Sequence, residues 1–379
     1  RVIQRGNDLS ISAELVKVAD GSQIWGEQYR RRVADIFTVQ EEIGRAISDQ
    51  LRLRLTREQK QQFAKRHTEN PEAYQEYLKG RYFWNRRTAA TLTTAIAHFE
   101  KAIALDPGYA LAYSGLADCY TVMTTYSPVP GREMFARAKA AAQKALELDE
   151  TLGEAYAVLG VLKGLDDWDW KGGDEDLKRA LYLSPSYATA HQWYALFITA
   201  LGRLEEALAE MKRAHELDPL SLLISTRFGQ WLSYSSRHDE AIEQHRKTLA
   251  MDPNFGHAHF GLGLALLHQR KYGEALVELR KGAQLLEGDP YALASLGYAY
   301  AVAGQRAEAR KILEDFQERS RRGYFPSWTL AVVSTELGEG DQAFEWLRKS
   351  IEERDVNLMV LRVDPYFAPL RSDPRFAEL

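Results

Sequence analysis

The stretch GHAHFGLGLALLHQRKYGEALVELRKGAQLLEGDP, residues 256–290, reads as two helices joined by a short turn, and its pattern recurs along the chain. A column of alanines has a period of 34 residues: Ala207, Ala241, Ala275, Ala309 and Ala343. Glycines keep the same period at Gly229, Gly263 and Gly297. Several columns with one period indicate a repeat architecture, in which each unit buries its apolar face against its neighbours.

Helix–helix contact explains these columns. Glycine and alanine let two backbones approach closely, and larger apolar residues fill the remaining gap. A second glycine column is interrupted twice: Gly202, Ser236, Arg270, Gly304 and Gly338. The glycine columns are expected to include a helix-ending position, where positive φ is needed. A column of large side chains has one polar member, His245, among Met211, Leu279, Leu313 and Leu347. Each unit is therefore expected to be a helix, a turn, a second helix and another turn.

A 34-residue helix–turn–helix with these columns resembles the tetratricopeptide repeat (TPR) family. Units are expected to start at or near Tyr74, Ala110, Gly153, Ala188, Leu222, Gly256, Pro290 and Tyr324. The unit from Ala110 carries about nine extra residues near 124–131, and the unit from Gly153 carries one. The resemblance implies a mainly α fold, a right-handed α-solenoid of about eight TPR helix pairs over residues 74–357. Residues 358–379 fall outside the period and are expected to cap the last apolar face.

Residues 1–60 follow a different pattern and predict a small partial α/β segment, with residues 61–73 as a linker. Apolar and polar residues alternate over 9–15, which is strand periodicity, and a second strand is expected around 24–29. The run Thr38-Val39-Gln40-Glu41 fits a capping box that opens a helix. Because the chain begins at Arg1 inside what reads as a strand, we expect it to be a fragment of a longer polypeptide.

The N-terminal segment, with its run at 23–29 and the aromatic run at 77–88, resembles the TolB N-terminal-like domain that often precedes bacterial TPR arrays. This resemblance implies an upstream serine/threonine kinase, winged-helix regulator or nucleotide cyclase. The expected location is the cytoplasm, or the periplasm if a transmembrane helix lies upstream of Arg1.

Composition excludes several classes of function. The formal net charge is −4, which argues against a nucleic-acid binder that needs a basic face. The single cysteine, Cys119, forms no intrachain disulfide and cannot supply a cysteine-based zinc site. The longest apolar runs are far below the roughly 20 residues that span a bilayer, so no membrane partner is expected. No catalytic motif is present, and neither a catalytic residue nor a cofactor is expected.

Two motifs suggest metal binding but fail on spacing. Asp167, Asp169 and Gly172 match the start of a calcium loop, yet Lys171 and Lys178 occupy positions that need oxygen ligands. His257 and His259 are two residues apart, so on a helix they face different directions, and His259 is expected to be a core residue. We therefore expect no metal site. The basic runs at 30–32 and 319–322 are expected to be solvated helix ends rather than anion sites.

The candidate site is the concave wall that the TPR resemblance places on the first helix of each unit. Its expected partner-binding residues are mostly aromatic: Tyr234, His257, Phe260, Tyr291, Tyr298 and Trp328. A contiguous row of exposed rings often marks an interaction surface. The alternative is that a tightly wound array buries these rings against its own neighbours.

The sequence therefore predicts a non-catalytic scaffold that binds a protein or peptide partner, with homo-oligomerisation left open. Within a bacterial signalling protein this would be a regulatory or sensory part. Two rival hypotheses remain: an accessory domain of an enzyme whose catalytic part is absent from this chain, and a sensor for a small apolar ligand with a closed pocket near Tyr298.

Overall fold

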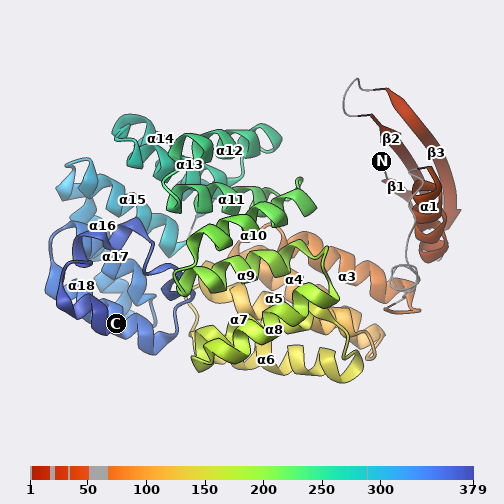
Figure 1. The fold of residues 1–379 in the computed structure, drawn as a ribbon, viewed down its shortest axis with the longest axis horizontal. Coiled ribbons are helices and arrows are strands. Elements are labelled where there is room, and N and C mark those ends of the chain that lie inside the picture. Colours follow the sequence, from red (N-terminus) through yellow and green to blue (C-terminus); the bar gives the residue numbers. More distant parts are fainter. Residues whose placement is uncertain (1, 18–21, 33–34, 51–66, 288) are drawn as a thin grey trace. The chain divides into compact units, whose positions relative to one another are not determined.

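The computed structural model describes residues 2–17, 22–32, 35–50, 67–287 and 289–379 (Figure 1). Its contacts divide the chain into two units, residues 1–78 with 101–109 and residues 79–100 with 110–379. Each unit is described by itself. The mainly α fold with a small N-terminal sheet, expected from the sequence, is confirmed.

The first unit contains a three-stranded antiparallel sheet in the order β1-β2-β3, followed by a helix. The strands are β1 (Val2–Arg5), β2 (Asp8–Val16) and β3 (Gln23–Arg32), and the helix is α1 (Ile36–Gln50). Within the sheet and α1, the buried apolar side chains among the described residues are Leu9, Tyr29 and Val39. The capping-box prediction was wrong in position, because α1 already begins at Ile36, before Thr38. Residues 61–66 of the expected linker lie outside the described residues.

The repeats form successive antiparallel helix pairs (Figure 1). The first helices of the pairs are α3 (Pro71–Trp84), α5 (Ala110–Tyr126), α7 (Gly153–Leu162), α9 (Ala188–Ala200), α11 (Leu222–Tyr234), α13 (Gly256–His268), α15 (Pro290–Val302) and α17 (Ser327–Glu336). The second helices are α4 (Ala89–Leu105), α6 (Gly131–Leu148), α8 (Trp170–Leu183), α10 (Leu204–Leu217), α12 (His238–Met251), α14 (Tyr272–Leu285), α16 (Arg306–Arg322) and α18 (Gly340–Glu353). Six of the eight expected unit starts coincide with the first residue of a helix, and the other two differ by three residues.

The interrupted glycine column is the helix-ending one, because it lies at the turn between the two helices of a pair. Its members all have positive φ, between 58° and 79°, and the column extends back to Trp168: Trp168, Gly202, Ser236, Arg270, Gly304 and Gly338. The left-handed conformation ends the first helix and reverses the chain. Three of these positions hold the strained conformation with a side chain, where only glycine is free of a steric penalty.

The uninterrupted glycine column marks close helix–helix approach. A Cβ at Gly263 would lie 2.5 Å from Leu279, and a Cβ at Gly229 would lie 2.6 Å from His245. Gly261 approaches His245 from the next unit, where a Cβ would lie 2.3 Å from the ring. The flat imidazole of His245 therefore fits between two glycines, and this explains how a histidine replaces the aliphatic residue of its column.

The two irregular units absorb their extra residues in different ways. The single extra residue after Gly153 forms a π-helical turn, η2 (Lys163–Asp167), consistent with π-helices arising from one-residue insertions. The longer insertion extends α5 to Tyr126 before the chain turns into α6. The calcium-like motif lies at η2, where Lys139 Nζ is 2.6 Å from both Asp166 Oδ2 and Asp167 Oδ1.

Beyond α18 the chain forms three 3-10 helices: η3 (Val356–Val360), η4 (Pro365–Leu370) and η5 (Pro374–Glu378). The helix η4 packs on α17. The helix η3 instead contacts α9 and α5, which belong to much earlier repeats. The C-terminal segment therefore reaches into the interior of its unit as well as covering the last pair.

Candidate functional site

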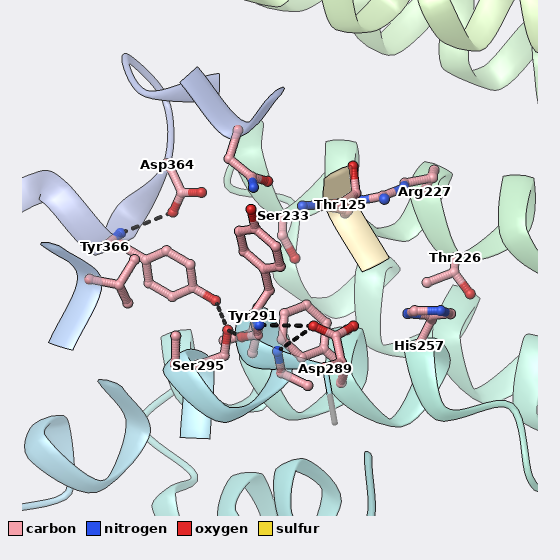
Figure 2. A pocket seen from close by; sticks show the side chains of 18 of the residues that line it. Thr125, Thr226, Arg227, Ser233, His257, Asp289, Tyr291, Ser295, Asp364 and Tyr366 are labelled. Carbon is pink, nitrogen blue, oxygen red and sulfur yellow. Dashed lines mark hydrogen bonds between the residues drawn. The ribbon is translucent and has the colours of Figure 1, made fainter. Parts of the chain in front are cut away.

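The inner face of the array encloses a cavity of about 110 Å³, lined mainly by α11, α13 and α15 (Figure 2). The end of α5 and the C-terminal segment complete its wall. Its aromatic lining residues are Tyr126, Tyr234, Phe260, Tyr291, Trp328 and Tyr366. Apolar rings thus surround a space that also receives several polar side chains.

Five of the six residues predicted for the concave wall line this cavity: Tyr234, His257, Phe260, Tyr291 and Trp328. Tyr298 does not. Its ring packs edge-on against Tyr366, with ring centroids 4.7 Å apart. Trp328 is only 2% exposed and its ring packs in the same way on Phe367. Part of the predicted aromatic row is therefore covered by the chain's own C-terminal segment.

The C-terminal segment is anchored in the cavity by hydrogen bonds. The Tyr366 and Ser295 hydroxyls are 2.5 Å apart, and the carboxylate of Asp364 accepts from the Tyr366 backbone N–H (Figure 2). Tyr291 donates its hydroxyl to Asp355 Oδ2 at 2.8 Å. The sequence period did not reveal these contributions of the tail. The available signal was that Asp364 and Tyr366 fall in a segment that leaves the 34-residue period.

Arg227 and His257 form the polar side of the cavity (Figure 2). Arg227 donates Nη1 to Gln230 Oε1 at 2.7 Å and Nη2 to the Tyr126 hydroxyl at 3.3 Å, so both partners are neutral. The His257 ring donates Nε2 to the backbone oxygen of Arg87 at 2.9 Å. Burial lowers the pKa of His257 to about 4, so this imidazole is neutral at physiological pH.

Two carboxyl groups in the cavity wall titrate unusually high. Asp289 caps the N-terminus of α15 and accepts from the Tyr291 and Ala292 backbone N–H groups, while burial raises its pKa to about 6. Burial also raises the pKa of Asp364 to about 7. The charge of this wall therefore changes between mildly acidic and neutral pH.

Other histidines are structural. His259 is buried, with Nδ1 2.5 Å from Glu278 and Nε2 2.9 Å from the Pro253 backbone oxygen, and His191 repeats both contacts with Glu210 and Pro185. His245 lines the cavity but has no hydrogen-bond partner for either ring nitrogen among the described residues. Burial lowers the pKa of His245 to about 3, so it stays neutral. Within the described ranges, no group of three or more potential metal-ligating side chains converges.

Comparison with known proteins agrees with the helix-pair geometry. A family model described as a tetratricopeptide repeat matches residues 227–292, which run from α11 into α15. The matched residues include the helix pair α13–α14, which keeps the 34-residue spacing of the array. Across the described residues, no helix combines the length and the apolar character needed to cross a membrane.

Two curated relatives share part of the chain. The transcriptional regulator HilA of Salmonella paratyphi A is 30% identical over 143 residues, 38% of this chain and 26% of that protein. Putative adenylate cyclase 3 of Rhizobium meliloti is 30% identical over 116 residues, 31% of this chain and 20% of that protein. The match thus spans about a quarter or less of these relatives.

Among solved structures, PilF of Pseudomonas aeruginosa is 22% identical, with a TM-score of 0.42 over 56% of this chain and 92% of that one. PilW, a type IV pilus biogenesis factor, is 18% identical, with a TM-score of 0.45 over 59% of this chain and 97% of that one.

Proposed function

We propose that this chain is a non-catalytic interaction scaffold, the regulatory or sensory part of a bacterial signalling protein that binds a partner segment at the inner face of its array. The observation that carries the proposal is the cavity lined by six aromatic rings. Rings of this kind anchor extended or helical segments by burying apolar area. The partial matches to a transcriptional regulator and to a putative adenylate cyclase support a fusion with an effector domain. The N-terminal sheet is consistent with the TolB-like domain that the sequence suggests.

The proposed contact residues are those of the predicted set that keep some exposure: Tyr234, His257, Phe260 and Tyr291. Trp328 and Tyr298 are not proposed as contact residues, because their rings pack on Phe367 and Tyr366 of the C-terminal segment. A partner segment would extend along the rings that the C-terminal segment leaves uncovered.

The test compares two aromatic-to-alanine variants in pull-downs with the wild-type chain. Phe260→Ala removes a ring from the cavity, and Tyr182→Ala removes a ring that is 76% exposed on α8, away from it. Loss of a buried anchor costs on the order of 1–3 kcal/mol of affinity, so Phe260→Ala should lose its partners and Tyr182→Ala should keep them. Circular dichroism must show that both fold. Equal recovery by all three proteins would reject the inner face as the binding surface.

A different form of the enzyme alternative is that the chain hides a hydrolytic site of its own. If the chain concealed a hydrolytic site of its own, it would turn over nucleotides or generic esters alone. We expect no turnover, since the sequence carries no catalytic motif.

A further inference from the structure

A second, smaller cavity of about 60 Å³ adjoins the aromatic one. The two share six lining residues: Thr125, Tyr126, Arg227, Gln230, Tyr234 and Asn357. It lies among α5, α9, α11 and η3. At roughly 10–15 Å³ per water-sized sphere, it holds about four to six such spheres. This is room for a small oxyanion with a short apolar group, not for a peptide.

A buried arginine lines this cavity without hydrogen-bond partners for two of its nitrogens. Arg87 follows α3 in a left-handed turn with φ 54° and is 1% exposed. Its Nε and Nη2 atoms make no hydrogen bond within the described part of the chain. Its guanidinium lies 3.7 Å from the centroid of the Trp84 ring, which holds it in place. Burial lowers its pKa to about 10, so it remains a cation at neutral pH.

Other unpaired polar groups surround the same space. The indole Nε1 of Trp193, 4% exposed, has no acceptor among the described residues. Gln192 Oε1 is likewise unpaired, and an amide flip would turn an N–H₂ group into its place. Arg227 adds a second guanidinium whose hydrogen-bond partners are both neutral. Leaving several buried polar groups unsatisfied is costly, so their convergence on one cavity indicates a ligand.

We propose that this cavity binds a small organic acid, whose carboxylate takes the Nε–Nη2 edge of Arg87 and the indole N–H of Trp193. The two free nitrogens of Arg87 lie on the same edge of the guanidinium, and this edge matches a carboxylate in bidentate geometry. The remaining wall includes Val122, Leu196 and Val360, which suit a short aliphatic group. A monoanion is favoured over a phosphate dianion, because desolvating a second charge here is expensive.

A ligand in this cavity contacts elements that are far apart in the sequence. Trp193 belongs to α9, whereas Val356 and Val360 of η3 close the cavity from the C-terminal segment. A bound acid therefore stabilises the docked position of η3, and with it the wall of the aromatic cavity. This inference does not depend on the proposed partner-binding function.

The competing explanation is a water molecule that joins Arg87 to the nearby carboxyl group of Asp118. Asp118 Oδ2 already accepts from Arg81 Nη1 at 3.0 Å and from the Tyr187 hydroxyl at 3.1 Å, but its Oδ1 is unpaired among the described residues. If a water molecule completes this network, added carboxylates should show no saturable binding to the cavity.

The test titrates the chain with acetate, propionate and butyrate, and with inorganic phosphate and chloride at equal ionic strength. Binding is measured by calorimetry and by thermal unfolding. The variants are Arg87→Lys, which keeps the charge but loses the fork, and Trp193→Phe, which keeps a ring but loses the N–H. Arg86→Lys, on an exposed neighbour in the same turn, is the matched control.

We expect saturable carboxylate binding by the wild type and by Arg86→Lys. Loss of a charge-assisted bond should weaken it by about tenfold or more in Arg87→Lys, and by a smaller factor in Trp193→Phe. Trp193→Phe keeps the test valid if Arg87→Lys does not fold. The proposal is rejected if the wild type shows no saturable binding, if both variants bind as the wild type does, or if phosphate binds more tightly than the carboxylates.

Discussion

Two glycines in this chain allow backbone strain to be tested separately from side-chain packing. Gly304 and Gly273 would both meet empty space with an added Cβ, but Gly304 has φ +79° and Gly273 lies in the first turn of α14. Gly304→Ala should therefore destabilise the protein by about 1–2 kcal/mol, since a side chain is strained in the left-handed region. Gly273→Ala should stabilise it by about 0.4–1 kcal/mol by restricting the unfolded chain. Urea unfolding measures both, and shifts of the same sign would contradict the conformational explanation.

His245 should make the protein sensitive to acid. Its pKa is about 3 in the folded protein, against an ordinary value of 6.5. As pH falls below 6.5, His245 takes up a proton in the unfolded chain but not in the folded chain. The free energy of unfolding therefore falls by about 1.4 kcal/mol per pH unit. His245→Leu, which restores the aliphatic residue of its column, removes this loss. The stability of the variant relative to the wild type should rise as pH falls from about 6.5 to 4. A difference that stays constant with pH, measured by urea unfolding, would show that His245 does not titrate in this way.

At the scale of helices, the 34-residue period predicted the first residue of most of the first helices. It missed helices whose first residue is set by the local sequence. Helix α17 begins at Ser327 instead of near Tyr324, because Pro326 disfavours a helical conformation at Phe325. Helix α1 begins two residues before the capping-box threonine. In both cases the period or motif marked the element correctly, and the local backbone set its first residue.

The 3-10 helix η4 offers a test of how the tail is held. Tyr366→Phe removes the hydrogen bond to Ser295 but keeps the ring packed on Tyr298. Ser295 still donates to the Tyr291 backbone oxygen at 2.9 Å, so no buried group is left unpaired. The expected loss is therefore only about 0.5–1.5 kcal/mol. A double-mutant cycle with Ser295→Ala, read by thermal unfolding, should show coupling between the two positions. Additive effects would mean that this bond contributes nothing to stability.

For the whole molecule, the period determined the helix pairs but could not predict what fills the interior. The repeat columns report contacts between neighbouring helices. The inner-face residues were predicted from the TPR resemblance, and Tyr234, Phe260 and Tyr291 among them line one cavity. The contacts of Tyr366 and of η3 join residues far apart in sequence and outside any period. No local pattern encodes such contacts, so Tyr298 was predicted as a lining residue although Tyr366 covers it.

These long-range contacts predict a departure from the behaviour of simple repeat arrays, in which damage spreads only to adjacent units. Ending the chain at Arg354 removes η3 and η4, so amide exchange should rise in α5 and α9 as well as in α17. Ending it at Asp373 removes only η5 and serves as the control. Hydrogen-exchange mass spectrometry compares the two. If exchange rises in α17 and α18 alone, η3 does not stabilise the early repeats.

The return of the C-terminal segment to α5 and α9 also has a consequence for synthesis on the ribosome. Helix pairs can form in order as they emerge, because each packs on the one before it. The faces of α5 and α9 that η3 covers must nevertheless stay open until residues 356–360 have been translated, more than 150 residues after α9. During this interval the nascent chain presents an unfinished apolar surface, which is where chaperones or the first aggregation contacts would act. Folding of this unit is thus completed only when residues 356–360 return to the earlier repeats.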